Sequence, residues 1–350
     1  MANSLYIAAM EPGSSKSVVA LGIMEMLSRR IRRVGYFRPV VPSVEEPDNN
    51  IRLIKSRYHL DLAYEDMFAY AHEDARNMVA DGQTEALLKN ILNKYKQLER
   101  KCKFILCEGT DFTGVGSAFE FDFNADVANN LGTPILTIVN GRNKTGDETV
   151  DAMQVARESF EGKGCTILAT IINRVTADRL PPVKAHLKAL GLEKEPIYIL
   201  PEEPSLGKPT VGEIARTLNA QILLGDAKGL NREVHDFKVA AMNLPHFLDH
   251  IADGDLIITP GDRGDVILAS LATTLSEISP NIAGLLLSGG LLPEDPIQRL
   301  IQGLEKYSPI PVISVGTDTY TTAMNASAVR SALTPENDRK IATALGIFES

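Results

Sequence analysis

The chain has 350 residues, of which 44% are hydrophobic and 23% charged, a balance typical of a globular protein large enough for two domains. Its net charge of −9, with no basic tract beyond four arginines between residues 29 and 33, argues against non-specific nucleic-acid binding. No apolar run approaches the roughly 20 residues that a membrane-spanning helix needs. The first residues lack a signal-peptide pattern and the three cysteines lack zinc-type spacing, which predicts a cytoplasmic protein.

From the N-terminus to about residue 200, short apolar runs alternate with amphipathic patterns of helical period. The runs predict strands at residues 5–10, 35–40, 104–107, 134–139, 166–172 and 197–200. The amphipathic patterns predict helices at residues 16–31, 85–101, 148–160 and 183–190. Strands that no polar residue interrupts are buried on both faces, as in parallel sheets with helical crossovers. The predicted class is therefore α/β, with a doubly wound, mostly parallel sheet.

The segment 206–231 breaks this alternation and contains one short helical pattern, at residues 211–218. A second alternation follows, with strands predicted at residues 239–242, 256–259, 283–287 and 311–315. Helices are predicted between and after them, at residues 244–251, 266–278, 296–307 and 319–333. We therefore expect a larger domain over residues 1–222 and a smaller α/β domain over residues 223–350.

The turn after the first predicted strand combines small residues with a Lys-Ser pair. It reads Glu11-Pro12-Gly13-Ser14-Ser15-Lys16-Ser17, and a helical pattern follows at once. This order of strand, small-residue loop and helix cradles phosphate groups in P-loop proteins. The backbone of Gly13, Ser14 and Ser15 is then expected to face the phosphates, Lys16 to neutralise them as an exposed loop residue, and the Ser17 hydroxyl to bind Mg²⁺. A standard Walker A loop has glycine at the position of Ser15, so a plain strand-to-helix turn with a capping serine stays open.

Two acidic residues occupy positions that suit a metal site. Glu108 ends a buried strand, at the sheet edge where P-loop proteins place the acid that organises Mg²⁺. Asp48 lies in a polar loop after the second predicted strand, where either a switch-like segment or an ordinary turn or cap is expected. Further on, two glycines and an acidic run predict a loop at residues 114–122.

With these features, the sequence resembles the dethiobiotin synthetase-like N-terminal region of long-form phosphate acetyltransferases, along nearly the whole chain. The resemblance is carried by the variant P-loop and by the segments Phe37-Arg38-Pro39-Val40, Glu108-Gly109 and Ile172-Asn173-Arg174. It implies that Asn173 lies by a nucleotide base and that the cofactors are ATP, or a related nucleotide, and Mg²⁺. Dethiobiotin synthetases carry Lys-Pro where this chain has Arg38-Pro39. A permanent cation at this position suits a phosphate or carboxylate but not proton transfer.

The second domain resembles the DRTGG domain that follows in the same proteins. The matching segments are Thr259-Pro260-Gly261-Asp262-Arg263-Gly264-Asp265 and Leu287-Ser288-Gly289-Gly290. If the strands are parallel, the loops 261–265, 288–290 and 316–318 share one sheet edge, where open α/β sheets bind ligands. Arg263 adds a cation suited to an anionic ligand. The alternatives are that these residues only build tight turns, with Arg263 paired to a nearby acid, or that this edge is a dimer contact.

The chain ends where the acetyltransferase module of those proteins would begin, so we expect no acetyl transfer by this chain itself. The expected function is a nucleotide-binding regulatory or assembly protein that binds ATP and Mg²⁺ at the first turn. Its second domain would sense a ligand or partner. One alternative is an ATP-dependent ligase or amidase of the dethiobiotin synthetase or cobyrinate amidase type, and another is an assembly subunit with a relic P-loop. Expected partners are a second copy of the chain and a separate enzyme of acetate metabolism, with no nucleic acid and no membrane. No catalytic residue is assigned.

Overall fold

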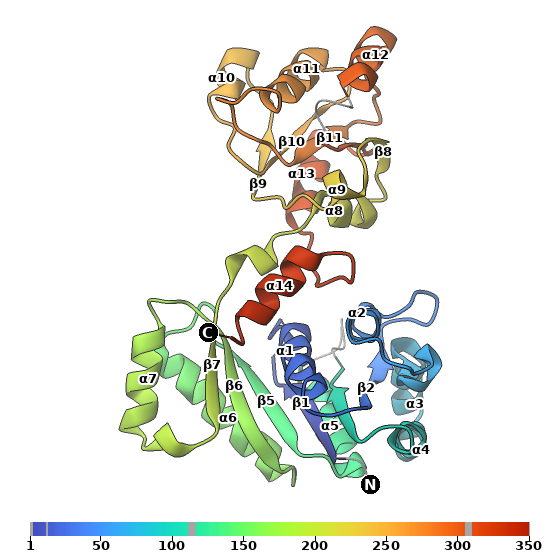
Figure 1. Cartoon of the computed structure of the whole chain (residues 1–350), viewed down its shortest axis with the longest axis vertical. Coiled ribbons are helices and arrows are strands. Elements are labelled where there is room, and N and C mark those ends of the chain that lie inside the picture. Colours follow the sequence, from blue (N-terminus) through green and yellow to red (C-terminus); the bar gives the residue numbers. More distant parts are fainter. Residues whose placement is uncertain (1–2, 12, 111–116, 305–309, 350) are drawn as a thin grey trace. The chain divides into compact units, whose positions relative to one another are not determined.

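A computed structural model describes residues 3–11, 13–110, 117–304 and 310–349 (Figure 1). The chain forms two compact units, one made of Met1–Glu203 with Leu333–Ser350 and the other of Pro204–Ala332. The predicted boundary after residue 222 therefore falls inside the second unit, and the last residues return to the first. Over the part of the chain that the structure describes, no helix is long and apolar enough to cross a membrane.

The first unit is built on a parallel sheet of seven strands in the order β3-β2-β4-β1-β5-β6-β7. The strands are β1 (Asn3–Ala9), β2 (Val34–Val41), β3 (Phe68–Ala71), β4 (Phe104–Glu108), β5 (Ile135–Asn140), β6 (Ile167–Val175) and β7 (Ile197–Pro201). Every residue of β2 is buried, as is every residue of β1 from Leu5 on, because apolar side chains point to both faces. The observed architecture confirms the predicted doubly wound class.

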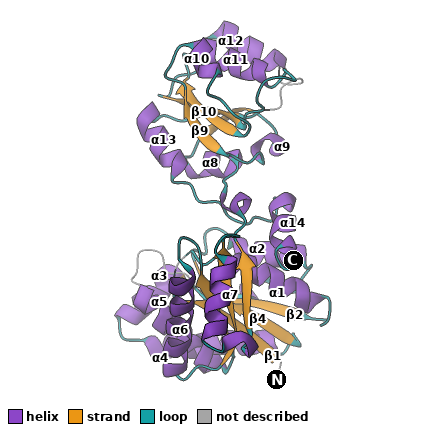
Figure 2. Cartoon of the chain, turned by 90° about the vertical axis from the view of Figure 1, so that its left-hand side faces the viewer, coloured by secondary structure: helices purple, strands orange, loops and turns teal. Residues whose placement is uncertain are grey.

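Helices lie on both faces of this sheet (Figure 2). They are α1 (Lys16–Ser28), α2 (Asn49–Arg57), α3 (His72–Ala80), α4 (Thr84–Glu99), α5 (Ser117–Leu131), α6 (Gly146–Gly162), α7 (Leu180–Ala189) and α14 (Asp338–Gly346). Because β1 lies between β4 and β5, the turn from β1 into α1 opens at the centre of the sheet's carboxyl edge. Side chains that follow β2, β4 and β6 reach the same edge.

The second unit contains a sheet of five strands in the order β8-β12-β11-β10-β9. The strands are β8 (Gln221–Leu224), β9 (Asp236–Val239), β10 (Asp255–Pro260), β11 (Gly284–Ser288) and β12 (Val312–Ser314). The helices are α8 (Val211–Thr217), α9 (Ala227–Leu230), α10 (Leu244–Leu248), α11 (Gly264–Thr273), α12 (Asp295–Leu304) and α13 (Thr319–Ser327). Strand β8 pairs antiparallel with β12, whereas the other pairs are parallel. Through this pairing Gln221, which precedes the predicted boundary, belongs to the second sheet.

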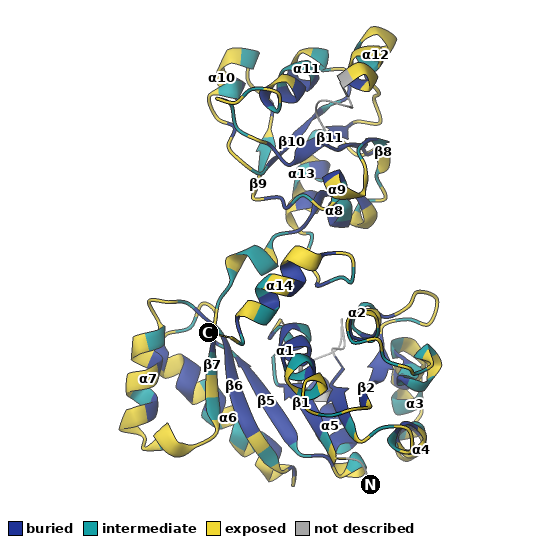
Figure 3. Cartoon of the chain, in the orientation of Figure 1, coloured by how far each residue is buried: buried dark blue, intermediate teal, exposed yellow. Residues whose placement is uncertain are grey.

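The last helix, α14, packs on the first unit rather than on the second. Its buried face carries Ile341 and Ala344 and is visible as the dark side of the helix in Figure 3. After it, Phe348 lies over Gly22 of α1, so closely that a β-carbon added at Gly22 would clash with the Phe348 ring. Before it, the Leu333 carbonyl accepts a hydrogen bond from the side chain of Asn49. The segment from Leu333 on is therefore a structural part of the first unit.

This contact predicts opposite effects of one substitution in two backgrounds. Gly22→Ala forces the Phe348 ring to move and is expected to lower the free energy of unfolding by about 1–3 kcal/mol. In a Phe348→Ala background the space is open, and the same change is expected to raise stability by up to about 1 kcal/mol, because alanine favours a helix interior over glycine. Urea titration of the wild type, the two single variants and the double variant measures the effect of Gly22→Ala in each background. Equal effects of Gly22→Ala in the two backgrounds would contradict the packing of α14 on α1.

Candidate functional site

The turn between β1 and α1 has the backbone of a phosphate-binding loop. Gly13 and Ser15 both take positive φ, 74° and 58°, and α1 begins at Lys16 directly after the left-handed Ser15. Among the described residues no side chain caps α1, and its first turn holds no acidic residue. The first N–H groups of a helix have no partner inside the helix, so this end favours an anion. The Ser14 hydroxyl is buried without a hydrogen-bond partner in the described structure.

Residues at the end of β6 hold this turn in place. The Asn173 side-chain amide donates to the Ser14 carbonyl at 2.9 Å, and the Arg174 guanidinium donates to the Gly13 carbonyl at 3.0 Å. Arg174 is itself oriented by two hydrogen bonds to the Glu202 carboxylate, at 2.8 and 3.0 Å. Asn173 therefore acts on the loop backbone in this structure, and its assignment to a nucleotide base stays a prediction.

Lys16 is buried, with 3% of its surface exposed, and this corrects the expectation of an exposed loop lysine. Its ammonium nitrogen lies 3.4 Å from the Glu120 carboxylate and 3.4 Å from the Thr110 carbonyl oxygen. Glu120 is in helix α5, so the loop expected over residues 114–122 is wrong from residue 117 on. The two glycines of that expected loop, Gly114 and Gly116, lie outside the described residues. The helix brings a carboxylate to Lys16 that the sequence pattern did not reveal.

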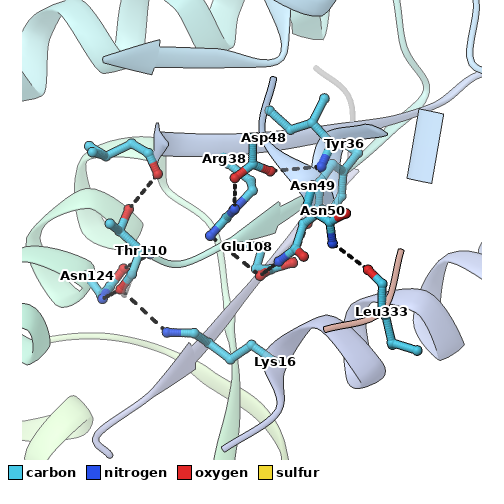
Figure 4. A network of polar contacts seen from close by, with 12 residues as sticks. Lys16, Tyr36, Arg38, Asp48, Asn49, Asn50, Glu108, Thr110, Asn124 and Leu333 are labelled. Atoms are coloured by element: carbon cyan, nitrogen blue, oxygen red, sulfur yellow. Dashed lines mark hydrogen bonds and ion pairs between the residues drawn. The ribbon is translucent and has the colours of Figure 1, made fainter. Parts of the chain in front are cut away.

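Asn124 fixes the carbonyl that Lys16 contacts (Figure 4). Its side chain accepts from the Thr110 N–H at 2.9 Å and donates to the Thr110 carbonyl at 3.0 Å. The Tyr6 hydroxyl donates to the same Asn124 oxygen at 2.8 Å. All three residues are buried, and Tyr6 comes from the central strand. The Lys16 ammonium group is thus held against a rigid part of the core.

A second buried cluster surrounds Arg38, the fifth of the eight residues of β2. Its guanidinium donates to the Asp48 carboxylate and lies 3.8 Å from the Glu108 carboxylate, so it bridges the two acids (Figure 4). Glu108 also accepts hydrogen bonds from the Tyr36 hydroxyl and, at 2.7 Å, from the Asn50 amide. Burial raises the pKa of Glu108, and the positive charge of Arg38 opposes that rise. The cluster places one cation between two carboxylates in the interior.

The assignment of Ser17, Asp48 and Glu108 as metal ligands stays a prediction, and the structure shows other contacts for the two acids. Asp48 and Glu108 both face the Arg38 guanidinium. The Asp48 carboxylate also caps α2 by accepting from the Ile51 N–H at 2.9 Å, which is the alternative role expected for it. Among the described residues, no group of three or more His, Cys, Asp or Glu side chains is placed to hold a metal ion. Carboxylate oxygens suit Mg²⁺, but here both carboxylates already face the Arg38 guanidinium.

The glycine-rich loops of the second unit are paired among themselves. The Gly289 N–H donates to the Thr317 carbonyl at 2.7 Å, and the Gly290 N–H donates to the Val315 carbonyl at 2.9 Å. Arg263 makes two hydrogen bonds of 2.9 Å to the Asp265 carboxylate. These pairings match the alternative of tight turns with a paired arginine, and a ligand site at this edge stays a prediction.

A P-loop-type turn at the centre of a parallel sheet defines the class of this protein, an α/β nucleotide-binding fold. The profile of the AAA domain matches residues 3–215, and the chain belongs to this family. The profile of the DRTGG domain matches residues 213–329.

The chain is 44% identical over 355 residues to a phosphate acetyltransferase of Nitratidesulfovibrio vulgaris, and 35% identical over 353 residues to one of Synechocystis sp.. Each match covers 100% of this chain and 50% of the relative, so the chain spans about half the length of these relatives. Among solved structures, the MinD cell division protein of Aquifex aeolicus aligns over 59% of this chain and 84% of its own, with 16% identity and a TM-score of 0.36. A similarity this low says nothing about function.

Several residues of the site were not predicted from the sequence. Tyr36 and Asn50 each lie two positions from a predicted residue, Arg38 and Asp48. For Tyr36 a signal existed, because alternate residues of a strand share a face. For Glu120 the sequence held no such signal, since the role of this residue depends on how α5 is placed against the central strand.

The Arg38 cluster predicts a strong and pH-dependent effect of removing its cation. Arg38→Met leaves two buried carboxylates without a counter-charge and is expected to lower the free energy of unfolding by about 3–5 kcal/mol at pH 7. The loss should shrink as the pH falls from 8 to 5. Without Arg38 the pKa of Glu108 rises further, so the folded variant takes up a proton at a pH where the unfolded chain is still ionised, and this uptake stabilises the fold.

Urea titrations at several pH values measure this effect. The matched control is Arg52→Met on α2, where Arg52 pairs with Glu336 and both side chains are about half exposed. That change is expected to cost less than about 1 kcal/mol with little pH dependence. An Arg38→Met loss that is equal at pH 5 and pH 8 would rule out the proposed charge balance.

The left-handed conformation of Ser15 yields a second prediction. Ser15→Gly relieves the contact of the β-carbon at positive φ and is expected to raise the free energy of unfolding by up to about 1 kcal/mol, after the entropy cost of glycine is subtracted. Ser17→Gly, two positions on in the first turn of α1, is expected to lower it by up to about 1 kcal/mol. Thermal unfolding of both variants tests this prediction. A change of the melting temperature in the same direction for Ser15→Gly and Ser17→Gly would exclude strain at Ser15.

Proposed function

We propose that the turn of residues 13–17 binds the phosphate groups of a nucleotide, ATP or a close relative, and that the chain is a regulatory or assembly protein. The observation that carries the proposal is the start of α1 with Lys16 as its first residue. In the described part of the chain no side chain caps this helix, and the buried Ser14 hydroxyl beside it has no hydrogen-bond partner. An oxyanion at this position would meet helix N–H groups, a hydroxyl and an ammonium group. Membership of the AAA domain family supports the same ligand class.

The alternative of an ATP-dependent ligase or amidase receives no support from the Arg38 cluster. A carboxylate substrate would need the Arg38 guanidinium, which two internal carboxylates already engage. We therefore favour binding and regulation over catalysis. The role of Mg²⁺ is part of the proposal, with Ser17 and the nucleotide's own phosphates as its first ligands, because Asp48 and Glu108 are occupied by Arg38.

The chain matches about half the length of its phosphate acetyltransferase relatives. This similarity supports a role connected with phosphate acetyltransferase activity. We propose that the partner is a separate enzyme of acetate metabolism or a second copy of this chain. The DRTGG unit is proposed to receive the ligand or partner signal. Since the loops at residues 261–265 and 288–290 are paired internally, that unit's contact with a ligand or partner is proposed to lie elsewhere on it.

Isothermal titration with ATP, with and without Mg²⁺, tests the proposed site. Lys16→Gln keeps most of the buried side-chain volume and removes the charge, so the variant should fold and bind ATP about tenfold to a hundredfold more weakly, the usual effect of losing a charged hydrogen-bond donor. The control is Lys101→Gln, which removes a surface lysine paired with Asp66 just before β4. Equal ATP affinity of the wild type and Lys16→Gln, with both folded, would refute the proposed site.

A further inference from the structure

We infer that Glu120 competes with ligands for Lys16, and that an incoming phosphate group must displace the Glu120 carboxylate from Lys16. The inference rests on the proposed nucleotide site and names the residue that sets how tightly that site binds anions. Its basis is the ion pair between Lys16 and Glu120, at 3.4 Å, in which both side chains are almost fully buried. The lysine proposed to neutralise a ligand is therefore already neutralised by the chain itself.

The position of Glu120 is fixed by its helix. Asn124, one turn further along α5, donates to the Glu120 carbonyl at 2.9 Å and to the Thr110 carbonyl at 3.0 Å. Lys16 contacts the Glu120 side chain and the same Thr110 carbonyl. The carboxylate is thus presented to Lys16 by a rigid frame, and it leaves only if its own side chain changes rotamer.

The ion pair between Lys16 and Glu120 reduces the free energy that anion binding at Lys16 can gain. A buried lysine that exchanges one carboxylate for one phosphate oxygen gains little, because one charge-assisted bond replaces another. If Glu120 stays nearby as an anion, it repels the ligand at short range in a medium of low dielectric constant. Binding is then favourable for ligands whose several phosphates make further contacts with the loop and the start of α1. Glu120 therefore selects against small monoanions and weakens all anion binding.

Glu120→Gln tests this inference because it keeps the shape of the side chain and removes its charge. ATP and inorganic pyrophosphate should each bind about tenfold more tightly to this variant than to the wild type, a gain of about 1.4 kcal/mol. Asp122→Asn is the matched control, since Asp122 lies on the same helix, also pairs with a lysine, Lys163 at 2.6 Å, and is half exposed. The affinity of Asp122→Asn for ATP and for pyrophosphate should stay within about twofold of the wild-type values, because an exposed charge is screened.

Calorimetry of the three full-length chains separates the outcomes, with circular dichroism to confirm folding. Tighter binding by Glu120→Gln alone supports the inference. Wild-type binding with no gain in Glu120→Gln, or an equal gain in Asp122→Asn, overturns the inference and leaves the proposed function standing. Absence of binding by all three chains overturns both. If Glu120→Gln does not fold, Glu120→Ala serves as the second variant, with the same expected direction.

Discussion

The burial of Arg38 between two carboxylates is the constraint on which the site depends. Arg38 comes from β2, Glu108 from β4 and Asp48 from the start of α2, and all three are almost fully buried. Each carboxylate would be costly in the interior without the guanidinium, and the guanidinium would be costly without them. The balance therefore ties two strands and a helix together. It also explains why Asn50, on the first turn of α2, can reach Glu108.

Internal charge pairing also determines which charged groups the neighbouring turn between β1 and α1 has available for a ligand. The acids predicted to organise a metal ion contact Arg38, and the lysine proposed to meet a phosphate is paired with Glu120. Both cations of the site are thus neutralised in advance by the chain's own carboxylates. Besides Lys16, which a phosphate gains only by displacing Glu120, the attraction for an anion comes from the N-terminal end of α1 and the left-handed turn before it.

The sequence predicted the central sheet well because its strands are long apolar runs buried on both faces. The short edge strand β3 was missed, since Phe68–Ala71 is only four residues long and mostly half-buried. Strand β9 begins three residues earlier than predicted, because Asp236 and Lys238 interrupt the apolar pattern at an exposed edge. The role of Asp48 as a helix cap was among the expected alternatives, whereas the binding roles of Gly13, Ser17 and Asn173 stay predictions. The pairing of Lys16 with Glu120 depends on tertiary placement, which local sequence does not encode.

The return of the last segment to the first unit has a consequence for synthesis on the ribosome. Residues 204–332 are inserted between two parts of one folding unit. Domains generally fold as the chain emerges, from the N-terminus onward. The first unit cannot complete its packing at that stage, because Ile341 and Phe348 are made only after the whole second unit. Until then the nascent first unit leaves the surface around Gly22 uncovered, so the whole inserted unit is synthesised before its host can complete its packing.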